Sequence, residues 1–217
     1  LGDFGAEVIK IEPPGQGDPM RVWGREKAHG KSLWWPVVAR NKKAITLGLR
    51  QADGQALLKD LVKQSDFLLE NFRPGTMEKW GLGWSELSAI NPRLIMIRVS
   101  GFGQTGPYRD WVATDSTMCA ISGMQFKAGV ADREPLFSPG AMAYDIAGIM
   151  GAFASMTALF QRERTGYGQT LDLSVLEAVA QQTDWSFSNN SMTDAKLQEG
   201  LQSRIGSGPI YKIFPCK

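Results

Sequence analysis

The sequence places one carboxylate, Asp145, inside a long run of small and apolar residues at 138–160. Such a run predicts a buried helix or a membrane span, and an ionised carboxylate is costly in either place unless something uses or pairs it. On a helix, the small residues Gly148 and Ala152 share the face of Asp145 and leave space for a ligand beside it. A place in the first turns would favour the ionised form through the helix dipole. An ionised carboxylate suits a nucleophile rather than a general acid.

Two structural explanations compete with a catalytic role for Asp145. It could pair with a lysine or arginine in the core, or it could cap the helix that follows Pro139 and Gly140. Residues 141–160 also form a stretch of 20 residues with one charge, which is the length of a membrane span. Because Gly, Ala, Ser and Thr dilute its hydrophobicity, we expect a buried core helix and no membrane contact.

Other residues that could bind a ligand lie where predicted strands end. Asn71 and Phe72 could offer an amide and a stacking ring to a nucleotide. Basic side chains gather on the early turns, where an anionic ligand would bind, although any one of them could simply be solvated: Lys42, Lys43, Arg50, Arg73 and Lys79.

Residues 101–106 read Gly-Phe-Gly-Gln-Thr-Gly, which matches the G-x-G-x-x-G pattern of dinucleotide-binding proteins. That function requires a helix to begin inside the motif. Here Pro107 follows, and the next helical pattern begins only near Asp115. The motif therefore predicts a loop that needs its glycines for backbone geometry and that could line a ligand site.

Composition excludes several classes of function. The chain has 217 residues, of which 43% are apolar and 21% charged, with a net charge of +2, so nothing indicates nucleic-acid binding. Cys119 and Cys216 lie far apart and His29 is the single histidine, so neither a disulfide framework nor a metal site is indicated. We expect a cytoplasmic protein, and we interpret the abrupt ends of the chain as those of a fragment.

Hydrophobic patterning predicts strands that alternate with helices, which is typical of an α/β fold with a mostly parallel sheet. The run at 94–100 is nearly continuous and predicts a buried parallel strand. Asp53 is a candidate N-cap, and Ser174 with Glu177 forms a possible capping box. The strands are expected at 6–12, 41–49, 65–70, 94–100 and 169–173, and the helices at 53–63, 77–80, 85–90, 116–124, 141–164 and 174–183.

Several segments, taken in order, resemble the class III CoA-transferases, the group that contains formyl-CoA:oxalate and L-carnitine CoA-transferases. They cover nearly the whole chain and are specific as a set: LGDFGAEVIKIEPPG at 1–15, NKKAITL at 41–47, DFLLENFRPG at 66–75, NPRLI at 91–95, SGFGQTGPY at 100–108 and RERTGYGQTLDLS at 162–174. The resemblance implies a Rossmann-like large domain with flanking helices over residues 1–185, incomplete at its start. Residues 186–217 would then connect to a small domain that this chain lacks.

The resemblance also implies a mechanism. Asp145 occupies the position of the family's nucleophile, which attacks an acyl-CoA thioester to give a mixed anhydride and then an aspartyl-CoA thioester. An acceptor acid finally takes the CoA, so CoA is a substrate and no permanently bound cofactor is implied. Pro13 stands where some members carry an arginine, so that contact is in doubt. The positions that match CoA contacts of the family are Leu47, Arg50, Asn71, Phe72 and Lys79.

Family members form two interlocked ring-shaped subunits, so the resemblance implies a homodimer for the full-length protein. The main competitor is the α-methylacyl-CoA racemase branch, in which a His-Asp pair supplies the base for proton transfer. In this chain Thr114 stands in place of that histidine and cannot abstract an α-proton near neutral pH. A non-catalytic CoA-binding fragment is a further alternative. The residues identify neither the acyl group nor the acceptor acid.

Overall fold

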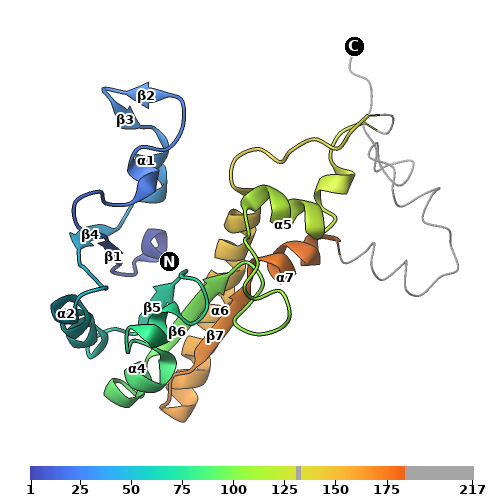
Figure 1. Ribbon diagram of the computed structural model, residues 1–217. Coiled ribbons are helices and arrows are strands. Elements are labelled where there is room, and N and C mark those ends of the chain that lie inside the picture. Colours follow the sequence, from blue (N-terminus) through green and yellow to red (C-terminus); the bar gives the residue numbers. More distant parts are fainter. Residues whose placement is uncertain (131–132, 184–217) are drawn as a thin grey trace, which may run out of the picture. The chain divides into compact units, whose positions relative to one another are not determined.

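The structure is a computed structural model that describes residues 1–130 and 133–183 (Figure 1). The predicted connection at 186–217 lies outside these residues. The described part divides into two compact units, which are treated separately below. The first unit consists of residues 1–66 and 77–92, and the second consists of residues 67–76 and the described residues from 93 onward.

The first unit is built on a two-stranded parallel sheet. Its strands pair in register from Ile9 with Lys43 to Glu12 with Thr46. Helix α2 packs against α4 through buried residues that include Leu58, Val62 and Leu87. Its elements are η1 (Gly2–Phe4), β1 (Ile9–Glu12), η2 (Pro19–Arg21), β2 (Lys27–Ala28), β3 (Lys31–Ser32), α1 (Trp34–Val38), β4 (Lys43–Thr46), α2 (Ala52–Val62) and α4 (Trp84–Ile90); α3 (Thr76–Lys79) joins the two units.

The structure corrects two sequence-based expectations in this unit. Asp53 does not cap α2, because the helix begins one residue earlier and Gln51 is the flanking residue, without a side-chain cap. Between the strands expected at 6–12 and 41–49, where no strand was expected, the chain forms a short antiparallel hairpin of β2 and β3. His29 forms its turn with φ +51°, followed by Gly30 with φ +74°. Strands of two residues are too short to leave a hydrophobic pattern.

The second unit contains a three-stranded parallel sheet in the order β5–β6–β7. The central strand β6 is fully buried from Ile95 to Ile97, as its continuous apolar run predicts. Parallel pairing in both sheets, with helices between the strands, confirms the predicted α/β class. The elements are β5 (Phe67–Glu70), β6 (Ile95–Ser100), α5 (Asp115–Ile121), η3 (Gln125–Lys127), α6 (Met142–Thr165), β7 (Thr170–Ser174), α7 (Val175–Ala180) and η4 (Gln181–Thr183).

Helix α6 runs alongside β6 and β7 and opposite to them in direction (Figure 1). Near its start, Ala143 and Ala147 belong to a cluster with Val99 and Leu173, at the carboxyl ends of the strands. Near its end, Ala158 packs with Ile95 and Ile97 at the amino end of β6. The first turn of α6 therefore lies at the carboxyl-terminal edge of the sheet.

Only one face of α6 is buried, so the expectation of a buried core helix is confirmed for that face and not for the opposite one. The opposite face leaves Ile149, Phe153 and Phe160 about two-thirds exposed or more, at 71%, 70% and 67%. By length and composition, α6 is the one helix among the described residues that could cross a membrane, a test that core helices of soluble proteins also pass. The buried face is lined by Ala143, Ala147, Gly151, Ser155, Ala158 and Arg162.

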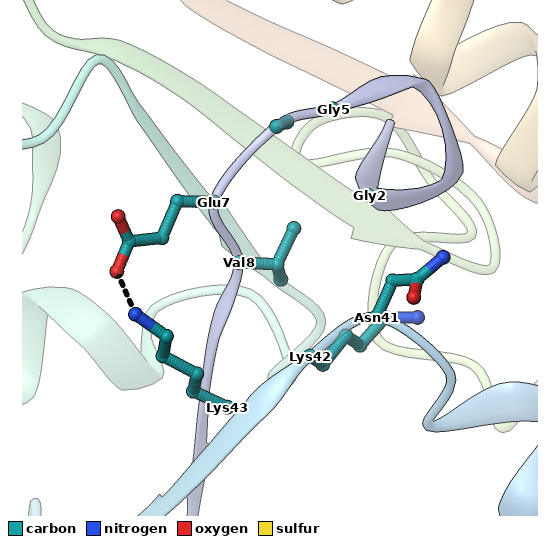
Figure 2. A pocket seen from close by; sticks show the side chains of 8 residues that line it. Gly2, Gly5, Glu7, Val8, Asn41, Lys42 and Lys43 are labelled. Atoms are coloured by element: carbon teal, nitrogen blue, oxygen red, sulfur yellow. Dashed lines mark hydrogen bonds and ion pairs between the residues drawn. The ribbon is translucent and has the colours of Figure 1, made fainter.

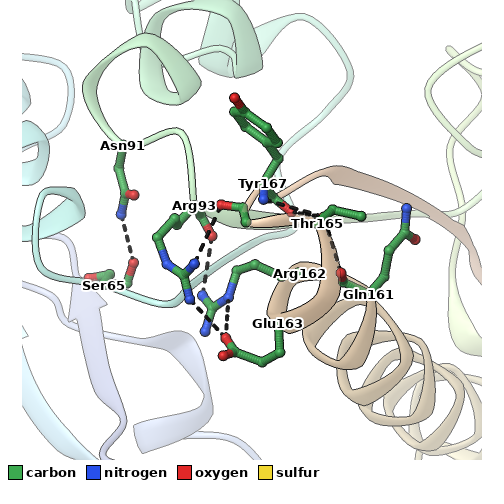
Figure 3. A network of polar contacts seen from close by, with 9 residues as sticks. Ser65, Asn91, Arg93, Gln161, Arg162, Glu163, Thr165 and Tyr167 are labelled. Atoms are coloured by element: carbon green, nitrogen blue, oxygen red, sulfur yellow. Dashed lines mark hydrogen bonds and ion pairs between the residues drawn. The ribbon is translucent and has the colours of Figure 1, made fainter.

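A network of polar contacts fixes the other end of α6 to the amino end of the sheet (Figure 3). The buried guanidinium of Arg162 donates to the carbonyl of Arg93 at 3.2 Å. Arg93 pairs with Glu163 at 2.8 Å. Gly168 passes so close to β6 that an added Cβ would lie 1.8 Å from the carbonyl oxygen of Leu94. The Arg-Glu-Arg-Thr-Gly-Tyr-Gly-Gln segment is thus an anchor between helix and sheet.

Candidate active site

Three predicted site segments meet at the carboxyl-terminal edge of the β5–β6–β7 sheet. Asn71 and Phe72 directly follow β5, and the glycine loop at 101–106 directly follows β6. Asp145 lies in the first turn of α6, which begins at the same edge. Ligands of open parallel sheets bind outside the carboxyl ends of the strands. The second unit therefore places Asp145, Asn71 and Phe72 at the edge of the sheet where such a ligand would bind.

Asp145 is exposed rather than buried. No ion pair or side-chain hydrogen bond within the described residues involves its carboxylate, so neither the buried ion pair nor the helix cap considered above is present. One turn further on, at Gly148, an added Cβ would have no atom within 4 Å, which confirms the predicted open space beside the carboxylate. The side chain therefore has the accessibility that a nucleophile needs.

The start of α6 is held by Asp115, the first residue of α5. One carboxylate oxygen of Asp115 accepts hydrogen bonds from the backbone N–H groups of Ala143 at 2.8 Å and Tyr144 at 3.3 Å. This satisfies two of the helix donors that have no partner within the helix. Burial, together with the negative charge of Asp115, raises the pKa of Tyr144. Sequence reasoning missed this cap because the two partners are 28 residues apart.

Thr114, which stands where the racemase branch has its histidine, has a structural task. It is the N-cap of α5 and forms a capping box with Thr117. Its hydroxyl accepts from the backbone N–H of Thr117 at 3.3 Å. A hydroxyl engaged in this way is no base for α-proton abstraction.

The glycine loop at 101–106 is not a dinucleotide fingerprint, as predicted, because the next helix begins only at Asp115. Gly101 is required sterically, since an added Cβ would lie 2.2 Å from the Cβ of Ala113. Gly103 adopts φ +86°. The next backbone N–H, that of Gln104, donates to both carboxylate oxygens of Asp172, at 3.0 and 2.9 Å. The backbone N–H of Gln104, which a phosphate-binding loop would offer to its ligand, is thus already hydrogen-bonded to Asp172.

The segment after β5 is held by a buried ion pair. Glu70 is 4% exposed, and one of its carboxylate oxygens binds Nε of Arg98 on β6 at 2.8 Å. The other oxygen accepts the backbone N–H of Phe72 at 2.7 Å. The side chain of Asn71 is exposed, and Phe72 is 37% exposed. Both predicted CoA contacts are thus presented to solvent on a firmly held backbone.

The remaining predicted contacts, Leu47, Arg50 and Lys79, belong to the first unit. Leu47 follows β4, and its backbone N–H donates to the carbonyl of Glu12 at 2.9 Å. Arg50 and Lys79 are exposed. Neither has an ion pair within the described residues, so both charges are available to an anionic ligand.

A hollow of about 540 Å³ in the first unit does not coincide with these residues (Figure 2). It lies before β1 and β4, at the amino ends of the strands, whereas Leu47 and Arg50 follow β4. Lys43 pairs with Glu7 across it at 2.6 Å. The lining residues are Gly2, Gly5, Ala6, Glu7, Val8, Asn41, Lys42 and Lys43.

The described residues contain no group of three or more His, Cys, Asp or Glu side chains that could hold a metal ion. Cys119 is a buried free thiol.

Comparison with known proteins identifies the family. The family described as CoA-transferase family III matches residues 1–217. The chain belongs to this family. Within it, the chain is 56% identical over 179 residues to succinyl-CoA–D-citramalate CoA-transferase of Chloroflexus aurantiacus, a match that covers 82% of this chain and 44% of that protein. It is 50% identical over 181 residues to the alpha subunit of succinyl-CoA–L-malate CoA-transferase of Chloroflexus aurantiacus, covering 82% and 42%.

A solved family member has the same fold. The crystal structure of a CAIB/BAIF family protein from Brucella suis superposes with a TM-score of 0.83 at 32% identity, covering 91% of this chain and 53% of that chain. The family III chain described here thus spans about half the length of the relatives that it matches. The α/β fold, and the membership inferred from the sequence segments, are both confirmed.

Proposed function

We propose that the protein to which this chain belongs transfers CoA from an acyl-CoA donor to a carboxylic acid, with Asp145 as the covalent nucleophile. The observation that carries the proposal is the state of Asp145: an exposed carboxylate in the first turn of α6, with open space at Gly148 and no charged partner in the described residues. Family membership supports the reaction class.

The reaction begins when an oxygen of the Asp145 carboxylate attacks the carbonyl carbon of the donor thioester. The C–S bond breaks, CoA leaves as a thiolate, and a mixed anhydride remains on Asp145. The thiolate then attacks the aspartyl carbonyl carbon and releases the donor acid as a carboxylate. This leaves an aspartyl-CoA thioester. The first step requires an ionised Asp145, and both steps require that its carboxyl group is sterically open.

The acceptor acid completes the cycle by the reverse chemistry. Its carboxylate attacks the aspartyl thioester, CoA thiolate leaves, and the thiolate then attacks the acyl carbon of the new anhydride. The product acyl-CoA is released and the Asp145 carboxylate is regenerated. No proton needs to be abstracted from carbon, which agrees with the structural role of Thr114.

CoA itself is bound as a substrate in this proposal. Asn71 and Phe72 contribute an amide and an aromatic ring from the second unit, next to the edge that carries Asp145. Arg50 and Lys79 contribute positive charge for the phosphate groups, and Leu47 contributes an apolar contact. These assignments follow the family resemblance, and the exposure of the polar members supports them.

The substrate class that we propose is short dicarboxylic acids, with succinyl-CoA as donor. The names of the two relatives above pair succinyl-CoA with D-citramalate and with L-malate, and both acceptors carry two carboxylates. For the assembly, we propose an interlocked homodimer of the full-length protein. Sedimentation equilibrium with mass spectrometry of the subunits tests this, and a monomer or a complex of two different chains contradicts it.

The test of the reaction uses the full-length protein with succinyl-CoA and a panel of acids that includes malate, citramalate, oxalate and acetate. Appearance of a new CoA thioester by mass spectrometry, with release of succinate, is expected for dicarboxylate acceptors. Hydrolysis of succinyl-CoA alone contradicts transfer. An α-deuterated acyl-CoA distinguishes the racemase reaction, because a racemase exchanges the label with solvent and a transferase retains it.

A further inference from the structure

We propose that three charged residues in one line across the sheet, Glu70, Arg98 and Asp172, position the two loops that leave its carboxyl-terminal edge, the edge at which the first turn of α6 carries Asp145. We call them the charged row. The proposal rests on the function proposed above, because it assigns to these loops the binding of CoA at the same site. The members of the row are positioning residues, since none of them is assigned a contact with the reacting atoms.

The row follows from the register of the three strands. Glu70 on β5 is the partner of Arg98 on β6, and Arg98 is the partner of Asp172 on β7. Partners in neighbouring parallel strands point their side chains to the same face of the sheet. The alternate residues Ile95, Ile97 and Val99 belong to the clusters that contain residues of α6. The charged row therefore lies on the sheet face away from α6, with a cation between two carboxylates.

At the β5 end, each of the two carboxylate oxygens of Glu70 accepts a hydrogen bond. Its two oxygens bind Arg98 and the backbone N–H of Phe72, at 2.8 and 2.7 Å. Glu70 is 4% exposed and Arg98 is 9% exposed. A glutamine here could accept only through one oxygen, so one of the two donors would face the amide NH₂ group. The conformation of the backbone at Asn71 and Phe72 therefore depends on the carboxylate of Glu70, and a side chain of the same shape without the charge would not hold it.

At the β7 end, Asp172 performs the same task for the glycine loop. Both of its oxygens accept the single N–H of Gln104. At the preceding Gly103, an added Cβ would lie 3.4 Å from one of these oxygens. The loop is tied back a second time where the N–H of Leu176 donates to the carbonyl of Gly101 at 3.0 Å. Each outer member of the row thus holds one loop that leaves the carboxyl-terminal edge.

A buried ion pair such as Glu70–Arg98 is a poor way to stabilise a sheet, because desolvation offsets most of the attraction between the charges. The rest of β6 up to Ile97 is apolar and fully buried, and Asp172, the third member of the row, is exposed. We therefore assign the row to loop geometry. Neutralising Glu70 leaves a buried Arg98 without its full partner and costs stability, whereas neutralising the exposed Asp172 should affect the glycine loop more than folding.

The experiment measures the affinity of the full-length protein for CoA by calorimetry, together with KM and kcat for succinyl-CoA. For Glu70→Gln we expect CoA binding and KM to worsen by about tenfold, with kcat within about threefold of the parent. Asp172→Asn keeps one acceptor oxygen at an exposed position, so we expect a smaller change in the same direction. Glu163→Gln, the same chemical change at the amino edge, is the matched control and should leave both constants unchanged.

Amide hydrogen exchange distinguishes a local loosening of the two loops from a general loss of stability. We expect faster exchange at Phe72 in Glu70→Gln and at Gln104 in Asp172→Asn, with β6 still protected. If the parent protein binds CoA and both variants bind it with the same affinity, the proposed role of the charged row is wrong and the proposed function stands. Failure of the parent to bind CoA overturns the proposed function and the row with it. If Glu70→Gln does not fold, Asp172→Asn decides by the same criteria.

Discussion

The two ends of helix α6 differ in how their charged side chains are engaged. At its first turn, Asp145 is exposed, has open space beside it and has no charged partner in the described residues. At its last turn, the polar groups are engaged: Arg162 is buried against the carbonyl of Arg93, and Arg93 pairs with Glu163. A carboxylate is left accessible at one edge of the sheet, and the helix that carries it is anchored at the other. Mutations at the two ends should therefore separate activity from stability.

The largest effect on activity is expected at Asp145. Asp145→Asn keeps the size of the side chain and removes the nucleophilic oxygen anion, so we expect kcat to fall by at least about a thousandfold. The midpoint of thermal unfolding should stay within about 1 °C, because the exposed side chain has no described partner to lose. Steady-state transfer assays and calorimetric unfolding of the same preparation check both statements. If Asp145→Asn retained most of the transfer activity, Asp145 would not be the nucleophile, and the two ends of α6 would not differ in function.

The largest effect on stability is expected at the anchored end. Gly168→Ala would place a Cβ 1.8 Å from the backbone oxygen of Leu94, so β6 and the segment before β7 would have to move apart. We expect a loss of at least about 3 kcal/mol in the free energy of unfolding. Urea unfolding measures it. A loss below about 1 kcal/mol would show that this contact does not anchor the helix.

A matched substitution at the reactive end should act in the opposite direction. At Gly148 an added Cβ meets no atom within 4 Å, and alanine is a better helix former than glycine. Gly148→Ala should therefore raise the free energy of unfolding by about 0.5–1 kcal/mol. Because the new methyl group occupies space beside Asp145, kcat/KM should fall by about tenfold. Unchanged activity would mean that substrate approaches Asp145 from another side.

The smallest effect concerns the ionisation of Tyr144 next to Asp145. Burial, assisted by the charge of Asp115, raises the pKa of this phenol above its ordinary value. The folded state therefore holds this proton more tightly than the unfolded state. The resulting stabilisation is present below the unfolded tyrosine pKa of about 10 and is lost as the pH rises through the folded value. Asp115→Asn should lower the pKa only in part, since burial remains, and ultraviolet titration against Tyr144→Phe measures it.

The fold was predictable because it depends on local patterns. A nearly continuous apolar run marked β6, helical spacing marked α2, and a long run of small and apolar residues marked α6, so the order of these elements followed from the sequence. The short β2–β3 hairpin and the true start of α2 did not, because two-residue strands and a cap without a side-chain bond leave little trace. Which face of α6 is buried could not be predicted either, since an apolar composition does not reveal which side of a helix has neighbours.

The candidate site could be named from the sequence as single positions, but the bonds that hold these positions could not. Asp145, Asn71 and Phe72 could be named from the residues and the family resemblance. The bonds that hold them, from Asp115 to Ala143, from Glu70 to Phe72 and from Asp172 to Gln104, join a side chain to a backbone group. Any residue can supply a backbone N–H, so no residue type at the receiving position signals such a bond.

The central claim is that Asp145 becomes covalently acylated during transfer. The most direct measurement incubates the full-length protein with succinyl-CoA and hydroxylamine, digests it, and maps modified peptides by mass spectrometry. Hydroxylamine converts an aspartyl anhydride or thioester into a stable hydroxamate, so the account predicts that modification on Asp145, dependent on succinyl-CoA. A protein that transfers CoA at its normal rate while Asp145 stays unmodified would contradict it.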